Sequence, residues 1–253
     1  MLGALPVFGR GADVGSSGRV SVSNHPRLLV SAAEWNSLGT RRRDDPDLER
    51  FATLLLTRAR KDLVLAPLTY KLDGRRLLST SREAIRRVLQ WALAYRVTGE
   101  AAFLDRARTE MLAVAAVPDW NPSHFLDVAE MTAGLAIGYD WLFNDLSADD
   151  RTLLRAAIIG KGISQARNGH KTFRYRNNWN QVCIGGMVLG AMAVQDDEPA
   201  LAADVFAAAR KEALAGLDAY QPDGVYPEGP GYWSYGTTYS VLLVAALRNA
   251  ALT

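Results

Sequence analysis

This sequence of 253 residues has little cysteine and little histidine, and its net charge is small. The single cysteine, Cys183, excludes an internal disulfide, so cysteine usage does not indicate a redox compartment. The histidines are only three, His25, His124 and His170, which disfavours a histidine-rich metal site. We expect no metal and no other cofactor within the chain. The net charge of +2 argues against a general affinity for nucleic acid.

Long hydrophobic runs are absent as well. No apolar run approaches the roughly 18–20 residues that a membrane span needs, so we expect no membrane partner. Residues 1–24 are rich in Gly and Ser and lack a basic leader followed by a long apolar segment. We interpret them as a flexible lead-in and not as a signal peptide, with one domain over residues 25–253.

What the chain does contain is helical periodicity. Apolar residues recur with helical spacing over most of residues 25–253, and no segment convincingly predicts a strand. Ser31 with Glu34 and Ser147 with Asp150 have the spacing of capping boxes, and Ser81 is expected to cap another helix. About nine helices are predicted, including those over 46–65, 81–99, 101–117, 125–143, 147–167, 199–220 and 238–252 and one that begins at Asn178 or Asn180.

The segment 125–143 is apolar nearly all round, interrupted by Asp127, Glu130 and Asp140. Such a helix must be covered on both sides. Short loops between successive helices favour antiparallel helix hairpins. We therefore predict an all-α fold in which inner apolar helices alternate with outer amphipathic ones in a double-layered ring. The three acidic residues would line its inner face or form buried pairs with arginines.

Residues 174–186, RYRNNWNQVCIGG, gather polar side chains around one tryptophan at the expected start of an apolar helix. Amides hydrogen-bond to sugar hydroxyls and carboxylates, an indole stacks on a sugar ring, and a helix N-terminus favours an anion. One asparagine is enough to cap a helix, so the whole set favours glycan binding over capping alone. The candidate residues are Arg174, Arg176, Asn177, Asn178, Trp179, Asn180 and Gln181.

Residues 223–239, DGVYPEGPGYWSYGTTY, hold four tyrosines, one tryptophan, four glycines and an isolated glutamate. This composition predicts a rigid loop at a cleft through residue 236. Tyr232, Tyr235 and Trp233 are candidates to meet a ligand, although each tyrosine by itself is more simply interpreted as covering the core. Glu228 is interpreted as an anchor for the loop, with a catalytic carboxylate as the alternative. We expect this loop and residues 174–186 to face each other across one groove.

A tyrosine in this loop needs help to act as a base, because a phenol has an ordinary pKa near 10. Nearby cations such as Arg174 or Arg176 would lower it. His124, after the loop that contains Trp120, is more simply a helix cap or a hydrogen-bonded surface group. We nevertheless retain His124 and Trp120 as candidate substrate-binding residues.

With these motifs in hand, the chain resembles the helical domain of the heparinase II/III-like polysaccharide lyases. The resemblance covers nearly the whole chain from His25. NNWNQVCIGGM at 177–187 and DGVYPEGPGYWSYGT at 223–237 together are specific, while HPRLL near the start and FLDVAEMTAGLAIGYDWLF at 125–143 are supporting. The resemblance implies an incomplete (α/α) toroid, usually followed by a β-sandwich domain, and a periplasmic or secreted protein. Without a β-sandwich domain before Thr253, the chain is expected to be a fragment or a shortened member.

The family cleaves uronic-acid glycans by β-elimination, so the resemblance implies an acidic polysaccharide as the partner. An asparagine of the NNW motif typically neutralises the sugar carboxylate, a role that falls on Asn177 or Asn178. A tyrosine of the later motif typically donates a proton and sometimes takes one, a role that falls on Tyr232 or, second, Tyr235.

One departure concerns the base. Many relatives carry a histidine beside that asparagine, whereas Asn178 or Trp179 stands there in this chain. Tyr232 would then act as both base and acid, or activity would need residues outside the chain. Two alternatives stay open: an unsaturated glucuronyl hydrolase using carboxylates among Asp140, Asp223 and Glu228, and a glycan-binding domain without catalysis.

Overall fold

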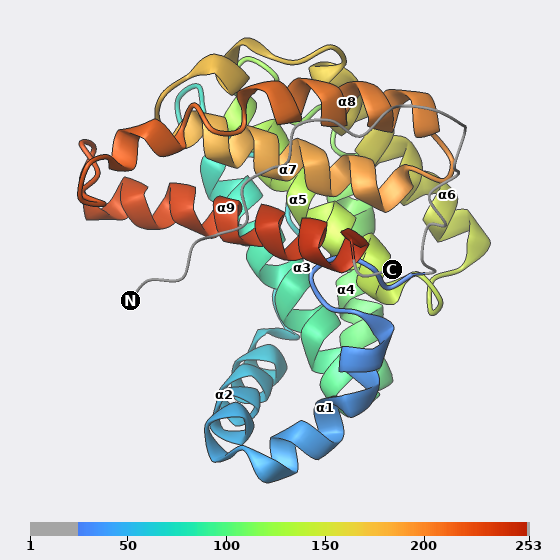
Figure 1. Cartoon of the computed structure of the whole chain (residues 1–253). Coiled ribbons are helices and arrows are strands. Elements are labelled where there is room, and N and C mark those ends of the chain that lie inside the picture. Colours follow the sequence, from blue (N-terminus) through green and yellow to red (C-terminus); the bar gives the residue numbers. More distant parts are fainter. Residues whose placement is uncertain (1–24, 252–253) are drawn as a thin grey trace, which may run out of the picture.

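The computed structural model describes residues 25–251, and the predicted lead-in over residues 1–24 lies outside the described residues. The described part is all-helical and has no strand apart from an isolated bridge between Asp73 and Arg76 (Figure 1). The predicted all-α class is confirmed. The helices are α1 (Ala32–Asp44), α2 (Pro46–Asp62), α3 (Leu78–Thr98), α4 (Ala101–Ala116), α5 (Phe125–Leu142), α6 (Ala148–Ala157), α7 (Asn178–Val194), α8 (Pro199–Glu212) and α9 (Pro230–Ala251).

Two of the three predicted helix caps are confirmed and one is wrong. Ser31 and Glu34 form a reciprocal capping box before α1, and the Ser147 side chain accepts the Asp150 N–H before α6. Ser81, however, does not cap α3, which begins at Leu78. Its hydroxyl is buried in the first turn and donates instead to the Glu130 carboxylate of α5.

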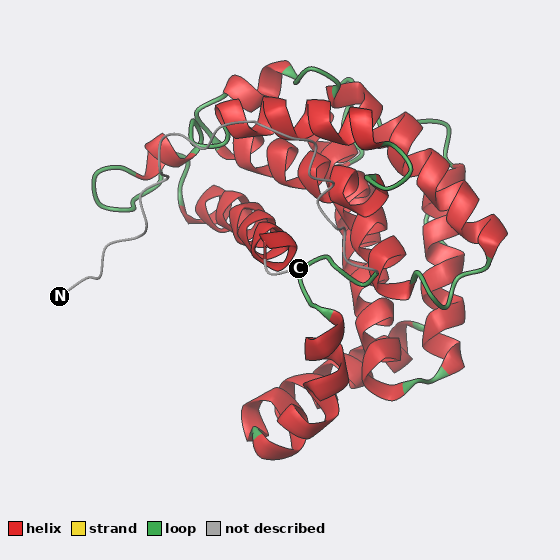
Figure 2. Cartoon of the chain, turned by 45° about the vertical axis from the view of Figure 1, so that its right-hand side comes forward, coloured by secondary structure: helices red, strands yellow, loops and turns green. Residues whose placement is uncertain are grey.

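Helices α3, α5, α7 and α9 form a row in which each contacts the next. The contacts between neighbouring helices rise together in residue number. Between α3 and α5, Ile85 faces Gly134 and Val88 faces Gly138. The other two pairs follow the same rule, with contacts Ala129–Gly186 and Thr132–Gly190 between α5 and α7, and Gln181–Gly236 and Gly185–Tyr239 between α7 and α9. The four helices therefore run in the same direction, so all four N-termini lie on the same side of the row. This side is called the N-terminal end of the row, and the side with the four C-termini is the opposite end. Helices α4, α6 and α8 pack behind this row as a second layer, and Figure 2 shows the two layers as a curved, open arc.

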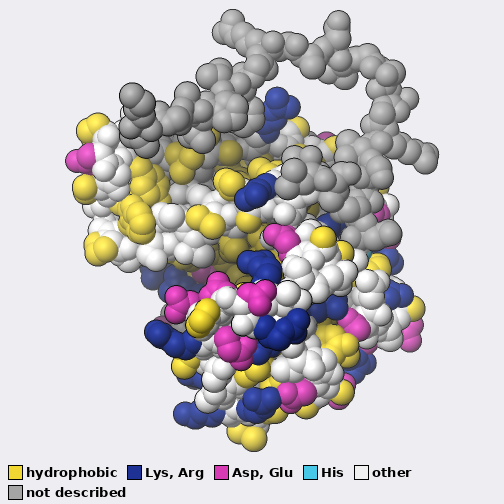
Figure 3. Space-filling model, turned by 60° about the horizontal axis from the view of Figure 1, so that its bottom comes forward, with side chains coloured by type: hydrophobic (Ala, Val, Ile, Leu, Met, Phe, Trp, Pro, Cys, Tyr) yellow, Lys and Arg dark blue, Asp and Glu magenta, His cyan; other side chains and the backbone are white. Residues whose placement is uncertain are grey.

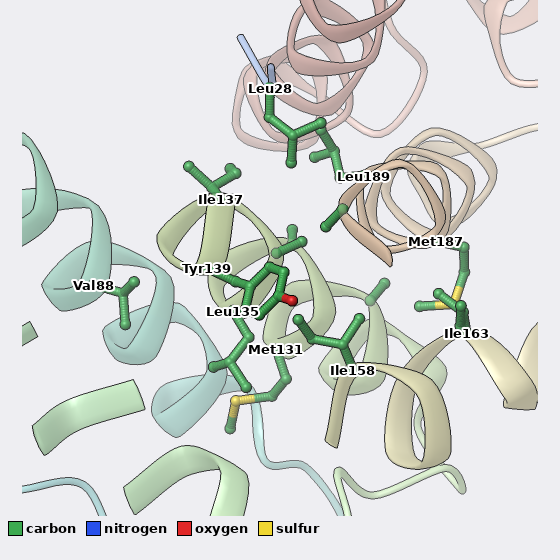
Figure 4. Packing of buried hydrophobic residues seen from close by; sticks show 14 of the residues in the cluster. Leu28, Val88, Met131, Leu135, Ile137, Tyr139, Ile158, Ile163, Met187 and Leu189 are labelled. Atoms are coloured by element: carbon green, nitrogen blue, oxygen red, sulfur yellow. The ribbon is translucent and has the colours of Figure 1, made fainter. Parts of the chain in front are cut away.

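Helix α5 is the centre of the core, since every residue from Phe125 to Leu142 is buried. Figure 4 shows its side chains between Val88 of α3 on one side and Met187 of α7 and Ile158 on the other. The prediction that this segment is covered on both sides is confirmed. Gly186 makes this packing possible, because a Cβ on it would lie 2.9 Å from the Ala129 Cα.

Several predicted boundaries are wrong. Helix α6 ends at Ala157, and a π turn, η1 (Ile158–Gly162), and a 3-10 turn, η2 (Ile163–Ala166), replace the rest of the expected helix over 147–167. Helix α8 stops at Glu212, with a separate 3-10 turn, η4 (Leu217–Tyr220), after it. A further 3-10 turn, η3 (Lys171–Arg174), precedes α7.

A boundary in the tyrosine-rich stretch is also wrong, because α9 begins at Pro230 and not near residue 238. Proline suits the first helical position, where its missing N–H costs no hydrogen bond. Gly229, at φ +86°, turns the chain just before it, and its carbonyl accepts the Trp233 N–H at 3.0 Å. Tyr232 and Tyr235 therefore lie on the first turns of a helix and not on a loop.

Within residues 25–251, no helix combines the length and the apolar character needed to cross a membrane.

Candidate functional site

The two motif stretches meet at the N-terminal end of the helix row. Asn178, the first residue of α7, donates from Nδ2 to Oε2 of Glu228 at 2.7 Å, although fifty positions separate them. One turn further on, Gln181 lies against Gly236 of α9. The start of α7, the 223–229 loop and the start of α9 therefore pack together.

The asparagines at the start of α7 have different environments. Asn177 is the N-cap, half-buried, and its side-chain oxygen accepts the Trp179 N–H at 3.1 Å. Its amide N–H groups have no partner among the described residues, so they remain available to an acceptor. Asn178 is 1% exposed and committed to Glu228. Asn180 is fully buried, and its amide donates to the carbonyls of Phe173 and Glu212.

Glu228 has the anchoring contact that the sequence favours for it, because its bond to Asn178 ties the loop to α7. Tyr226 is buried beside it, and burial together with the Glu228 carboxylate raises the pKa of that phenol. The indole of Trp233 donates to the Gly224 carbonyl at 3.1 Å and closes the loop on α9. A cavity of about 340 Å³, lined by Tyr226, Pro230 and Trp233 among others, opens on this loop.

Three tyrosines of α9 run from the surface into the core. Tyr232 is 47% exposed, Tyr235 is partly buried and Tyr239 is 4% exposed. Positions 232, 235 and 239 are spaced i, i+3 and i+7, so the rings share one face of the helix. The rings of Tyr235 and Tyr239 meet edge to face, with centroids 5.7 Å apart. Of the three phenols, Tyr232 is therefore the most accessible to a ligand.

Tyr235 belongs to a polar cluster that spans three helices. Its hydroxyl donates to Oε1 of Glu130 on α5, and the Ser81 hydroxyl of α3 donates to Oε2 of the same carboxylate. The Arg82 guanidinium lies 5.0 Å from the Tyr235 ring centroid, and its Nε is 3.4 Å from Glu130 Oε1. Glu130 is 1% exposed, whereas the Arg82 side chain is 54% exposed.

Burial dominates the protonation of this cluster. It raises the pKa of Glu130, although hydrogen bonds from Ser81 and Tyr235 favour the carboxylate. Burial and the adjacent Glu130 charge raise the pKa of Tyr235, against the opposing charge of Arg82. Glu130 is therefore more basic than an ordinary carboxylate, and a free Tyr235 phenolate is disfavoured at neutral pH.

Arg174 and Arg176 do not have the expected role beside a tyrosine of α9. Arg176 pairs with Asp218 at the surface. Arg174 lines a separate cavity of about 220 Å³ with His170 and residues of α8. The cation that contacts a candidate tyrosine is Arg82, which the sequence does not single out.

Trp120 is completely buried, and its indole donates to the Val114 carbonyl at 3.1 Å. An indole without solvent access cannot stack on a sugar, so the expected contact of Trp120 with substrate is not supported. Gln181 is 4% exposed and donates to Tyr220 and Ser240, both at 3.0 Å, so it joins α7 to η4 and α9. Both residues serve packing at this end of the molecule.

His124 does sit at the site, at the start of α5. Its Nδ1 lies 3.0 Å from Oδ1 of the buried Asp127, and its ring meets Trp179 edge-on with centroids 4.9 Å apart. Both His124 and Trp179 are partly exposed, so they connect the starts of α5 and α7 at the surface. Asp127 also accepts the Leu77 N–H at 2.7 Å and so supplies the missing cap of α3.

Asp140 is remote from this site. It lies near the C-terminal end of α5, is fully buried, and accepts hydrogen bonds from His25, Arg27 and Leu28. A larger cavity of about 740 Å³ lies between residues 26–34 and residues 240–249, and none of the predicted site residues lines it.

The site residues missing from the sequence prediction are Ser81 and Arg82. Only the packing of the helices reveals the role of these two residues at the site, because nothing in the neighbouring sequence distinguishes them from other residues near the start of a helix. Glu130 had a visible signal, as an acidic residue in a segment that is otherwise apolar. Its expected pairing with an arginine is present as the 3.4 Å contact with Arg82.

Among the described residues, no group of three or more His, Cys, Asp or Glu side chains could hold a metal ion. Comparison of the sequence with protein-family models and with curated proteins gives no match.

Proposed function

We propose that this chain is a polysaccharide lyase that cleaves uronic-acid-containing glycans by β-elimination. The observation that carries the proposal is the contact between Asn178 and Glu228, which brings the amide-rich start of α7 beside the tyrosines of α9. An amide can neutralise the uronate carboxylate and a phenol can transfer a proton, which are two of the tasks in a β-elimination at a uronate.

The same end of the molecule is suited to an anionic sugar. The N-terminal ends of α5, α7 and α9 carry partial positive charge and lie together, and the half-exposed guanidinium of Arg82 adds a full charge. On the face drawn in Figure 3, Lys and Arg side chains are interspersed with Asp and Glu. Attraction of an acidic glycan would therefore come from this local arrangement and not from a uniformly basic surface.

Within the proposal, Asn177 neutralises the sugar carboxylate. It is the more exposed of the two candidate asparagines, and its amide N–H groups are available while its oxygen caps α7. Neutralisation makes the proton beside the carboxylate more acidic. Tyr232, at the exposed end of the tyrosine row, donates a proton to the leaving O4. Trp179 and Trp233 offer partly exposed aromatic faces for sugar rings.

The proposal includes the architecture. A curved row of parallel helices with antiparallel helices behind it is the arrangement expected of part of an (α/α) toroid, and the site would lie at the end where the inner helices begin. The hydrolase alternative is weaker, because Asp140 is buried at the opposite end of α5 and cannot pair with Asp223 or Glu228 at a glycosidic bond.

A panel of acidic glycans tests the proposal through the ultraviolet absorbance of the unsaturated uronate. A lyase generates this chromophore, a hydrolase consumes it, and a binding domain does neither. We expect Tyr232→Phe to lower kcat by about 10²–10⁴-fold with glycan binding retained. Asn177→Ala should lower kcat/KM by about 10²–10³-fold.

The matched controls are Tyr95→Phe and Asn144→Ala. Tyr95 bonds to Asp145, and Asn144 bonds to the His25 carbonyl, both at the opposite end of the helix row. These variants should keep wild-type rates. A wild-type chain that binds a uronate glycan and never forms the chromophore would falsify the lyase proposal.

A further inference from the structure

The roles assigned so far, Asn177 as the neutralising amide and Tyr232 as the acid, leave the base unassigned. None of the groups in the cluster around Glu130 is a histidine, and burial disfavours a phenolate at Tyr235. A neutral phenol can take a proton from substrate only if its own proton leaves at the same time. The hydroxyl of Tyr235 already points its proton at Oε1 of Glu130.

We infer that Glu130 is a positioning residue that acts through Tyr235, accepting the phenol proton while Tyr235 removes the proton beside the uronate carboxylate. This inference rests on the proposed function. Glu130 is 1% exposed, so it does not contact the sugar itself. Tyr235 is partly exposed and is the connection between the buried carboxylate and the surface.

The step balances without a further reactant. The C5–H bond of the uronate breaks, and its proton goes to the Tyr235 hydroxyl oxygen, whose own proton passes to Glu130. The electron pair left on C5 forms the C4–C5 double bond, the C4–O4 bond breaks, and O4 takes a proton from Tyr232. After product release, Glu130 returns its proton to Tyr235, which releases the extra one to solvent, and Tyr232 is reprotonated from solvent.

The surroundings of Glu130 suit an acceptor that must ionise before each turnover. Ser81 and Arg82 face it from α3, Tyr235 and Tyr239 from α9, and Cys183 from α7. Ser81 and Arg82 favour the carboxylate, whereas burial opposes it. In its ionised form, Glu130 is therefore a better proton acceptor than an exposed carboxylate.

The pH dependence of kcat/KM in Glu130→Gln tests the inference. Glutamine keeps the shape and can still accept the Tyr235 hydrogen bond, but it cannot take up the proton. We expect a fall in kcat of about 10²-fold or more and the loss of the acidic limb of the pH profile. Tyr235→Phe should cost about as much, and the double variant little more, because the two residues act as a unit.

Ser81→Ala provides a second variant that keeps the carboxylate. Without the Ser81 hydroxyl the carboxylate is less stabilised, so the acidic limb should move to higher pH, a shift that a merely structural role would not produce. Glu83→Gln is the matched control, since Glu83 lies on α3 and bonds to Arg86 and Arg87 instead. It should leave the profile unchanged.

The two levels of proposal fail differently. If the wild-type chain is active and Glu130→Gln keeps its rate and its acidic limb, the relay is wrong and the lyase stands. If the wild-type chain forms no chromophore, both are wrong. Ultraviolet titration of tyrosine gives a readout independent of activity. Glu130 opposes ionisation of both the Tyr235 and the Tyr239 phenols, so Glu130→Gln should lower the pH at which they ionise, and adding Tyr235→Phe should remove the Tyr235 part of that change. Failure to see this shift would also overturn the coupling of Glu130 to Tyr235.

Discussion

At the scale of single residues, the contact between Asn178 and Glu228 holds the two halves of the candidate site together. Asn178 is 1% exposed, while Glu228 is exposed on the loop before α9. A hydrogen bond between a buried amide and a carboxylate at 2.7 Å is charge-assisted and fixes the loop against α7. The position of Tyr232 therefore depends on a residue pair that does not itself transfer a proton.

Replacing Asn178 by Asp should break this contact. Two carboxylates would then face each other across the 2.7 Å contact, with one of them buried. We expect the free energy of unfolding to fall by about 1–3 kcal/mol, measured by urea denaturation. Adding Glu228→Gln should restore most of the loss, because a glutamine amide can donate to the new carboxylate. An Asn178→Asp variant as stable as wild type would argue that the contact does not hold the loop.

The sequence alone predicts part of this site, because some of its residues stand out from their immediate neighbours in the chain. Asn177, Asn178 and Glu228 are visible because each departs from its immediate neighbours: amides at the start of an apolar helix, and a lone carboxylate between Pro and Gly. The role of Arg82 is not visible in the sequence, because it depends on the fold bringing Tyr235 of α9 and Glu130 of α5 beside the start of α3. Arg176 was expected beside a tyrosine, but it pairs with Asp218.

At the scale of elements, helix existence is predictable from periodicity, while helix ends depend on contacts that periodicity does not contain. The start of α9 at Pro230 follows from the turn at Gly229. Ser81 is of a residue type that often caps helices. The hydrogen bond that caps the start of α3 nevertheless comes from Asp127 on α5, which accepts the N–H of Leu77 across fifty residues of sequence. The glycines of 178–194 allow a close approach between helices, and Gly186 meets the backbone of Ala129.

An ion network joins α2 to α3 and predicts a specific acid sensitivity. Asp62 is 5% exposed and accepts hydrogen bonds from Arg58, Arg86 and Gln90. Burial alone would raise the pKa of Asp62, but these hydrogen bonds outweigh it and lower the pKa to about 2. Since the folded pKa lies below the unfolded one, Asp62 stabilises the fold above the unfolded value, and this contribution is lost as the pH falls from about 4 to about 2.

Asp62→Asn should therefore destabilise the protein by about 1–2 kcal/mol at neutral pH, with the difference from wild type vanishing near pH 2. Urea denaturation across this pH range measures it. Asp105→Asn, an exposed aspartate on α4, is the control and should change stability little at any pH. If the loss of unfolding free energy caused by Asp62→Asn stayed constant down to pH 2, the stabilisation would not depend on the ionised Asp62 carboxylate, and the prediction would be wrong.

At the scale of the whole molecule, the two ends of the helix row have separate tasks. The N-terminal ends carry the candidate site, whereas the other end is closed by the segment before α1. His25 Nδ1 and the Leu28 N–H meet Asp140 at 2.6 and 2.8 Å. Arg27 reaches on to Asp196 at 2.7 Å. Residues 25–28 are thereby fastened to both α5 and the segment just after α7, far from any group proposed to touch substrate.

Asp140→Ala should therefore cost global stability without altering the site. It removes a fully buried carboxylate and leaves the N–H groups of Arg27 and Leu28 without their acceptor, so we expect a loss of about 3–5 kcal/mol in urea denaturation. Asp140→Asn keeps one acceptor oxygen and should lose less. The control, Asp44→Ala, truncates an exposed aspartate at the end of α1 and should stay within about 0.5 kcal/mol of wild type.

Because Asp140 lies at the opposite end of α5 from Glu130, the tyrosine titration of the Asp140 variants should match wild type while they remain folded. A changed titration would mean that the two ends of the helix row are coupled, and an Asp140→Ala variant as stable as Asp44→Ala would show that this fastening contributes nothing to the fold.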